Sequence, residues 1–350
     1  MVKPVEIAGR WVGPGEPCFI VAEVGVNHNR DLDMARRLVD AAKSAGADAV
    51  KFQAFKAERL AAACAPKAHY QAETTGGGES QLEMLRRLEF SQEANRTISA
   101  YCRQQGIWYM CTPFDEESAD FLETLDVAVF KVPSGEVTNL PYLRHIAQKG
   151  RPMIVSTGMS TEAEVAEAVR VIREAGNPPL ILLHCVSNYP ADPADANLRA
   201  MASLTRAFGV PVGYSDHTPG IEVALAAVAL GACVIEKHVT LNRNLPGPDH
   251  QMSLEPDELA ALVRGIRLVE RALGHGRKEP AARELETAAV ARKSLVAACD
   301  VRAGTRLTEA LITTKRPGIG LPPSLLPQVI GRIAAQDIPA DALIALEMLR

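Results

Sequence analysis

The sequence predicts an α/β fold, a (β/α)₈ TIM barrel followed by a small β-rich domain. Two observations favour the barrel: eight short apolar segments alternate with amphipathic helical patterns, and polar residues gather at the carboxyl end of each apolar segment. From Ser294 the texture changes to short strands rich in Gly and Pro, which indicates a separate domain. A doubly wound open sheet is the alternative, but no GxGxxG motif follows the first strand.

The elements follow one another in a regular order after a short hairpin in residues 1–17, which we expect to cover the barrel floor. The expected strands are Phe19–Glu23, Ala49–Gln53, Trp108–Cys111, Val129–Val132, Met153–Ser156, Leu180–His184, Val212–Tyr214 and Val234–His238. Helical patterns include Leu32–Ala45, Glu116–Leu125, Leu140–Gln148, Thr161–Ala175, Ile221–Leu230 and Pro256–Leu273. Residues 56–92 are the longest excursion from this pattern. We therefore expect a barrel domain at 1–278, a helical linker at 279–293 and the small domain at 294–350.

The length, net charge, apolar stretches and cysteine content of the chain argue against several classes of protein. With 350 residues the chain is long enough for one large domain and a small one, and its net charge of −4 without a basic run argues against a nucleic-acid partner. No apolar stretch reaches the roughly 20 residues that span a bilayer, and no signal peptide is evident. Seven scattered cysteines without a CxxC pair favour a reducing cytoplasm.

The stretch from Gly213 to His250 holds two histidines, His217 and His238, each close to a carboxylate. Because a strand alternates its faces, Glu236 and His238 point the same way and Lys237 points opposite. We expect Asp216, His217, Glu236 and His238 to converge at one end of the sheet, as a divalent-metal and acid–base site. The alternative is two core histidines that are hydrogen-bonded to backbone.

Two lysines, Lys51 and Lys131, lie inside apolar strands, where an uncompensated charge costs several kcal/mol. Together with hydroxyl groups at other strand ends they would form a cradle for phosphate and carboxylate, and these hydroxyls belong to Thr112, Ser134 and Ser156. Internal Lys–Glu salt bridges are one alternative. A Schiff-base aldolase is another, but the histidine pair argues against it.

Ten short motifs follow one another along the chain: AEVGVNHN, GADAVKFQ, CTPFDEES, FKVPSGE, STGMS, LLHCVSNYP, VGYSDHT, VIEKH, PGPDH and TKRPG. Taken together in this order, they resemble the sialic acid (N-acetylneuraminate) synthase family along nearly the whole chain, including a C-terminal antifreeze-like SAF domain. The resemblance implies a metal-dependent condensation of phosphoenolpyruvate with an N-acetylmannosamine-type sugar, with release of phosphate. It also implies a domain-swapped homodimer in which the small domain of one chain caps the barrel of the other.

The resemblance assigns roles residue by residue. It implies that His217 and His238 are metal ligands, with Mn²⁺ expected and Mg²⁺ or Co²⁺ as alternatives. Lys51, Lys131, Thr112, Ser134 and Ser156 correspond to the phosphoenolpyruvate site, and Glu23, Gln53, Tyr189, Glu236 and Asp249 to the surroundings of the sugar and the reacting carbons. Of these, Glu23, Lys51, Lys131 and Glu236 are the expected catalytic residues. Arg316 corresponds to an arginine that reaches across the dimer to the N-acetyl group of the sugar; without the resemblance it would be taken for a surface arginine bonded to local backbone.

One position departs from a well-studied branch of the family, which has an asparagine near the phosphate where this chain has Ser187. The resulting SNYP motif is more similar to legionaminic-type synthases, which would use 2,4-diacetamido-2,4,6-trideoxymannose. The expected activity is therefore N-acetylneuraminate synthesis, with a legionaminic-type synthase as the alternative. A carbohydrate-binding relative that has lost activity is a further alternative.

Overall fold

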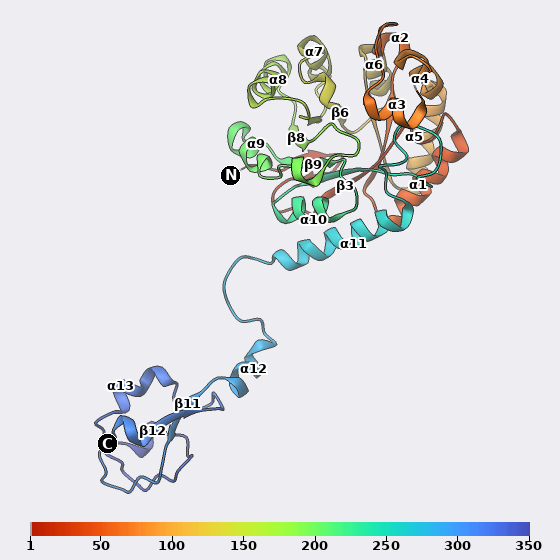
Figure 1. The fold of residues 1–350 in the computed structure, drawn as a ribbon. Coiled ribbons are helices and arrows are strands. Elements are labelled where there is room, and N and C mark those ends of the chain that lie inside the picture. The colour runs from red at the N-terminus through yellow and green to blue at the C-terminus, as the bar shows by residue number, and fades with distance from the viewer. Residues whose placement is uncertain (1, 77) are drawn as a thin grey trace. The chain divides into compact units, whose positions relative to one another are not determined.

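A computed structural model describes residues 2–76 and 78–350 of the chain, which form two compact units that divide between Gly274 and His275. The first unit carries the strand–helix repeat, and the second carries the Gly- and Pro-rich segments (Figure 1). The domain limits expected from the sequence, at residues 278 and 294, stay a prediction.

Within the described residues, eight parallel strands form one sheet in the order β5-β4-β3-β10-β9-β8-β7-β6. Strands β5 and β6, at the two ends of this order, lie next to each other and close the ring. The strands span Phe19–Gly25 (β3), Ala49–Ala54 (β4), Trp108–Pro113 (β5), Phe130–Val132 (β6), Met153–Ser156 (β7), Leu180–Cys185 (β8), Val212–Asp216 (β9) and Val234–His238 (β10). The predicted (β/α)₈ barrel is confirmed.

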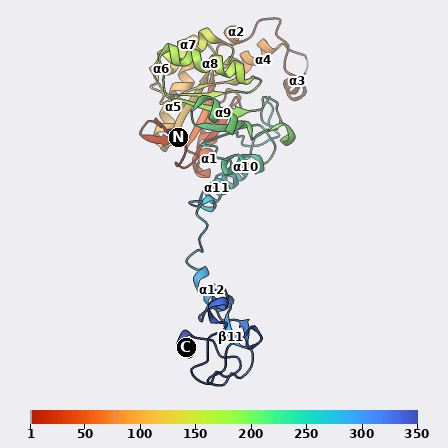
Figure 2. The ribbon, with the colours of Figure 1, turned by 90° about the vertical axis from the view of Figure 1, so that its left-hand side faces the viewer.

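Helices cover the outside of the ring, and α7 and α8 lie side by side there (Figure 2). These helices span Leu32–Ala45 (α1), Gln92–Gln105 (α5), Glu116–Thr124 (α6), Leu140–Gln148 (α7), Glu162–Ala175 (α8), Ala200–Phe208 (α9), Glu222–Ala229 (α10) and Pro256–Leu273 (α11). Their starts follow from local chemistry: Thr161 and Glu164 form a capping box before α8, in which the Thr161 hydroxyl accepts from the Glu164 N–H.

Strand alternation separates two apolar cores. Residues of one parity, such as Phe19 and Val21, point into the ring and pack with Met110 and Ile154, whereas residues of the other parity pack against the helices. The predicted N-terminal hairpin is present as β1 (Val5–Ile7) and β2 (Arg10–Val12), which pair antiparallel. Its buried residues Val5, Ile7 and Val12 belong to the inner core, so the hairpin closes the amino-terminal end of the ring.

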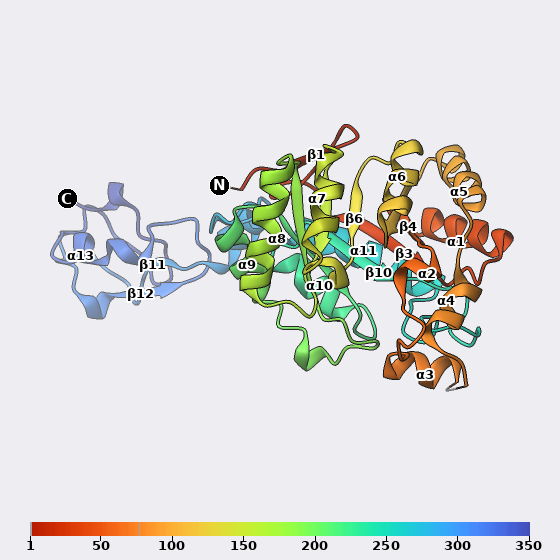
Figure 3. The ribbon, with the colours of Figure 1, turned by 90° about the horizontal axis from the view of Figure 1, so that it is seen from above.

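The long excursion between β4 and α5 is helical. It contains α2 (Ala57–Leu60), α3 (His69–Thr75) and α4 (Gln81–Leu88), which gather on one side of the barrel (Figure 3). Met84 and Leu88 of α4 pack with Val26 and Phe55 in a small apolar cluster of their own. The insertion is therefore anchored to loops at the carboxyl ends of β3 and β4.

The second unit contains the short helices α12 (Glu284–Ala291) and α13 (Leu326–Val329) and the antiparallel pair β11 (Ser294–Ala297) and β12 (Ile312–Lys315). Several isolated bridges, including Val301 with Ile338, add to this pair, and Leu295, Leu307 and Ile344 form part of a separate apolar core. The expectation of a small β-rich unit is met. Across the described residues of both units, no helix has the length and apolar character needed to cross a membrane.

Candidate active site

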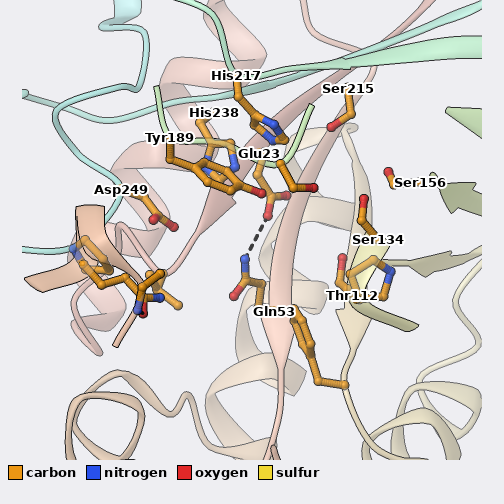
Figure 4. A pocket seen from close by; sticks show the side chains of 18 of the residues that line it. Glu23, Gln53, Thr112, Ser134, Ser156, Tyr189, Ser215, His217, His238 and Asp249 are labelled. Atoms are coloured by element: carbon orange, nitrogen blue, oxygen red, sulfur yellow. Dashed lines mark hydrogen bonds between the residues drawn. The ribbon is translucent and has the colours of Figure 1, made fainter. Parts of the chain in front are cut away.

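A pocket of about 430 Å³ opens at the carboxyl ends of the barrel strands. Apart from Asp216, it contains every barrel residue that the sequence singled out for the site: Glu23, Lys51, Gln53, Thr112, Lys131, Ser134, Ser156, Ser187, Tyr189, His217, Glu236, His238 and Asp249. In Figure 4, His217, His238 and Tyr189 lie together near Glu23. On the opposite side of the pocket lie Thr112, Ser134 and Ser156.

Strand alternation explains why polar side chains meet here. The inward residues of β3 are Phe19, Val21 and then Glu23, so the inner face of the strand is apolar until its last residues. In β10 the same parity gives Val234, Glu236 and His238. An apolar plug fills the ring below, and the polar residues above it form the closed end of the pocket.

Two lysines and two glutamates form the closed end. The Lys51 Nζ atom lies 2.7 Å from Glu23 Oε2 and 3.7 Å from Glu236 Oε2, and Lys131 Nζ lies 3.5 Å from Glu236 Oε1. Each lysine also donates to a hydroxyl: Lys51 to Thr112 Oγ1 at 2.9 Å and Lys131 to Ser156 Oγ at 2.8 Å. The Lys–Glu bridges of the alternative and the hydroxyl contacts of the predicted cradle therefore occur together on the same two lysines.

The pKa values of these four groups are driven apart. Burial raises the pKa of Glu23, and the neighbouring Lys51 only partly offsets this. Burial acts the same way on Glu236, but Lys131 and Lys51 together outweigh it and lower the pKa of that carboxyl. Burial also lowers the pKa of Lys131, whereas the two glutamates raise that of Lys51 against burial. Glu236 is thus the more firmly ionised carboxylate and Glu23 the one able to carry a proton.

The two histidines lie one strand apart, with ring centroids separated by 5.5 Å. His217 Nδ1 donates to the carbonyl of Val186 at 2.7 Å, which leaves the lone pair of Nε2 free, and burial lowers the pKa of His217 to about 4. Burial also holds the pKa of His238 well below its ordinary value, and among the described residues its buried Nδ1 has no partner. Two neutral imidazoles with unused nitrogen lone pairs fit a divalent cation.

Protein ligands for such a cation would be few. Over residues 2–76 and 78–350, no three His, Cys, Asp or Glu side chains are grouped so as to hold a metal. His217 and His238 would therefore supply two positions, and oxygen atoms of water or substrate the others.

The expectation that Asp216 joins this cluster is wrong. Its Oδ2 accepts from Lys237 Nζ at 2.7 Å, and its Oδ1 accepts from the N–H and hydroxyl of Thr218. Asp216 is the last residue of β9 and has the opposite parity to Ser215, so it faces away from the pocket, as Lys237 does. The residue of the correct parity is Ser215, whose hydroxyl donates to Glu236 Oε1 at 3.0 Å.

The sequence also did not predict one whole side of the pocket. The insertion supplies an apolar wall, defined here as Leu60, Met84, Leu85 and Leu88, and the side chains of Gln71 and Gln81 line the pocket beside it. Tyr70 of α3 packs on Tyr189 with ring centroids 5.0 Å apart, which ties the insertion to the loop after β8. Within residues 2–76 and 78–350, the only lysines or arginines that line the pocket are Lys51 and Lys131.

Close approach at the loop after β7 requires a glycine. A Cβ on Gly158 would lie 2.2 Å from Ser187 Oγ and 2.7 Å from Cys185 Sγ. The Gly158 N–H donates to Ser134 Oγ at 3.0 Å, so a backbone amide takes part in the hydroxyl-rich side of the pocket. This arrangement suits an anion.

Asp249 lies on the loop after β10, where it is buried and lines the pocket. Burial, with a smaller contribution from Glu23, raises the pKa of Asp249 to about 7. Arg316 belongs to the other unit: it is exposed, and its Nε donates to the carbonyl of Ala291 at 3.0 Å. That bond is the local one expected of an ordinary surface arginine, and the role implied by resemblance stays a prediction.

Comparison with known proteins gives consistent matches. The NeuB family matches residues 38–278, and the SAF domain matches residues 292–350. The N,N'-diacetyllegionaminic acid synthases of Campylobacter jejuni and Legionella pneumophila are each 46% identical, over 93% and 94% of this chain and 98% and 93% of their own. A crystal structure of N-acetylneuraminic acid synthetase from Leptospira borgpetersenii has a TM-score of 0.73 and 36% identity, over 82% of this chain and 95% of that one.

Proposed function

Since the chain belongs to the NeuB family and is a transferase, we propose that it is a nonulosonate synthase. It joins phosphoenolpyruvate to an N-acetylmannosamine-type sugar, takes up water and releases phosphate. The observation that carries this proposal is the closed end of the pocket, where two buried lysines with hydroxyl partners lie next to a pair of neutral histidines.

Phosphoenolpyruvate is the ligand whose chemistry suits the closed end. Its phosphate and carboxylate would accept charge-assisted hydrogen bonds from Lys51 and Lys131, and hydroxyls of Ser134 and Ser156 would complete the contacts. Without ligand, the two lysines are balanced by Glu23 and Glu236. Bringing in further negative charge favours the protonated form of Glu23, in line with its raised pKa.

The carbon–carbon bond forms between the methylene carbon of the enol and the aldehyde carbon of the sugar. The former enol carbon then carries positive charge, which the Glu236 carboxylate stabilises. Water adds to that carbon and loses a proton, and the carbon–oxygen bond to phosphate breaks. Glu23, whose Oε1 accepts from Gln53 Nε2 at 3.2 Å, gives its proton to the former aldehyde oxygen and takes up the proton that the water loses. As the bond to phosphate breaks, the added hydroxyl becomes the keto oxygen and its proton leaves with the phosphate.

A divalent cation, with Mn²⁺ proposed first, would be held by His217 and His238 and would polarise the aldehyde oxygen of the sugar. The low pKa values of both imidazoles keep their lone pairs available for a cation near neutral pH.

A specific observation favours a 6-deoxy sugar over N-acetylmannosamine. The apolar wall of Leu60, Met84, Leu85 and Leu88 offers a surface for a methyl group. The polar residues of the same insertion that line the pocket include Gln71 and Gln81, which are uncharged and offer a phosphate no cation. The legionaminic acid synthases of similar sequence point to the same class. We therefore propose 2,4-diacetamido-2,4,6-trideoxymannose as the acceptor, with N-acetylmannosamine as the second candidate.

A panel of sugars tests the proposal. The protein is mixed with phosphoenolpyruvate, Mn²⁺ and each candidate sugar, and phosphate release and product mass are measured. The proposal predicts release with an N-acetylmannosamine-type sugar and a product heavier than that sugar by the pyruvate unit. No release with any sugar, combined with sugar binding in calorimetry, would instead support a carbohydrate-binding relative without activity.

The domain-swapped homodimer and the role of Arg316 can be tested together by mixing two variants: Arg316→Ala, which should have a raised KM for the sugar, and His217→Ala, which should be inactive. If Arg316 serves the partner's barrel, mixed dimers regain one intact site and measurable turnover. If Arg316 serves the barrel of its own chain, no mixture regains activity. A monomer in sedimentation that is fully active would contradict the swapped dimer.

A further inference from the structure

A buried ion pair lies on the face of β9 and β10 that points away from the pocket. Lys237 Nζ and Asp216 Oδ2 are 2.7 Å apart, and their side chains are 2% and 0% exposed. Lys237 Nζ also donates to the carbonyl of Thr218, and Thr218 donates from its N–H and hydroxyl to Asp216 Oδ1. We call these three residues the outer clamp.

The strand register places the outer clamp directly behind the histidines. In the parallel pairing of β9 with β10, Ser215 lies opposite Glu236 and Asp216 lies opposite Lys237. His217 stands between Asp216 and Thr218 in the chain, and His238 follows Lys237. Asp216 and Thr218, which flank His217, are thus hydrogen-bonded to Lys237, which directly precedes His238. The clamp therefore links the backbone around His217 to the backbone next to His238.

Packing alone does not require charges at this position. A buried ion pair recovers little or none of the cost of desolvating it, and apolar side chains of similar volume would fill the same space. What the ion pair adds is direction, because its hydrogen bonds are satisfied in a narrow range of strand positions.

His238 has particular need of such a constraint. His217 is oriented by its bond to the Val186 carbonyl, but Nδ1 of His238 has no partner among the described residues. The position of the His238 ring thus depends on its backbone and on packing, for example against Tyr189 at 6.0 Å between ring centroids. The backbone next to it is fixed by Lys237.

We propose that the outer clamp is a positioning element that sets the separation of the His217 and His238 imidazoles and thereby the affinity of the site for a divalent cation. This inference rests on the proposed function, since it takes the two histidines to be metal ligands. The clamp itself touches neither substrate nor cation.

The test measures Mn²⁺ binding by electron paramagnetic resonance of the free ion, together with phosphoenolpyruvate binding in the absence of metal. The decisive variant is Asp216→Asn with Lys237→Met, which removes both charges and leaves no buried charge unpaired. Thr218→Val, which removes one hydroxyl of the clamp, is a milder variant in case the first does not fold. The control is Asp120→Asn with Lys149→Met, a pair between α6 and α7 whose lysine is 8% exposed.

We expect the double variant to bind Mn²⁺ about tenfold more weakly, the size typical of disturbing groups behind metal ligands, and Thr218→Val to bind it severalfold more weakly. Phosphoenolpyruvate affinity without metal should stay within about twofold in both, because Lys51 and Lys131 are untouched. The control should change neither affinity. Mn²⁺ binding at wild-type strength in every folded clamp variant would overturn the inference, as would an equal loss of phosphoenolpyruvate affinity.

The wild-type measurement separates this inference from the proposed function. If the wild-type protein binds Mn²⁺ and His238→Ala does not, the metal site stands and the clamp variants decide the inference alone. If His238→Ala binds Mn²⁺ as well as the wild type does, the metal assignment is wrong and the clamp proposal falls with it.

Discussion

The closed end of the pocket and its apolar wall are built in different ways. Strand ends form the closed end, where Lys51, Lys131, Glu23 and Glu236 satisfy one another within 2.7–3.7 Å. The wall comes from an insertion whose helices pack on loops. The difference teaches that the barrel fixes the groups for the chemistry, while an added segment shapes the space for the acceptor. Substitutions at the closed end should therefore affect turnover, and substitutions at the wall should affect the choice of sugar.

The largest effect on turnover is expected at His217 and His238, which lie next to the closed end. His217→Ala or His238→Ala should lower turnover by at least about a thousandfold, because each change removes a group that would hold the cation responsible for several kcal/mol of transition-state stabilisation. EDTA should abolish the turnover of the wild type and added Mn²⁺ should restore that turnover, as measured by phosphate release. His145→Ala, which removes a histidine paired with Asp120 outside the pocket, is the control. Full activity after exhaustive chelation would refute the metal role and revive the Schiff-base alternative.

Asp249 lies where the two parts of the pocket meet, since its charge acts on Glu23 at the closed end and on Tyr70 of the insertion. Its pKa of about 7 in the fold exceeds its ordinary value of 3.8, so between these values the folded protein holds a proton that the unfolded chain releases. Stability therefore falls as pH rises from about 4 to 7. Asp249→Asn should abolish this loss and raise the free energy of unfolding at pH 8 by up to about 4 kcal/mol.

Denaturant unfolding of the ligand-free protein at pH 4.5 and pH 8 measures this effect. The exposed Asp195→Asn should change neither value by more than about 0.5 kcal/mol. Equal stabilities of wild type and Asp249→Asn at pH 8 would contradict the raised pKa.

Lys131→Ala tests whether the closed end of the pocket binds phosphoenolpyruvate as its anion. A charge-assisted hydrogen bond to a buried anion is worth about 1.5–3 kcal/mol, so phosphoenolpyruvate affinity should fall by roughly 10- to 150-fold. Calorimetric titration measures the change, with Lys149→Ala as a control in the outer helices. Unchanged affinity in both the Lys51 and Lys131 variants would contradict the cradle.

The smallest effect is expected at the wall. Leu85→Gln places a hydrogen-bonding group on the half-buried face of α4, which should shift the ratio of kcat/KM values toward a hydroxylated sugar by about tenfold. Leu85→Met keeps the volume and should leave the ratio unchanged. Competition between the two candidate sugars, read by product mass, gives the ratio directly. A loss of turnover with no change in ratio would show that Leu85 supports the fold and not the choice of sugar.

The same contrast explains what the sequence could predict. Polar residues that end apolar strands, such as Lys51 and Glu236, can be assigned to the site because parallel strands share one edge and strand parity is fixed. Parity applied to the strand before His217 would also have found Ser215 and excluded Asp216. Leu85 and Tyr70 carry no such signal: the pattern predicts no orientation for an inserted helix, which depends on contacts such as that of Tyr70 with Tyr189.

The hairpin β1–β2 has a kinetic consequence. Val5, Ile7 and Val12 seal the far end of the ring, so ligands enter and leave the pocket from the side of the strand carboxyl ends. Because Lys131 belongs to the closed end of the pocket, we expect its anionic ligand to bind before the sugar covers it. We expect an ordered steady-state mechanism in which phosphoenolpyruvate is first in and phosphate is last out. Phosphate should then compete with phosphoenolpyruvate and act as a non-competitive inhibitor toward the sugar.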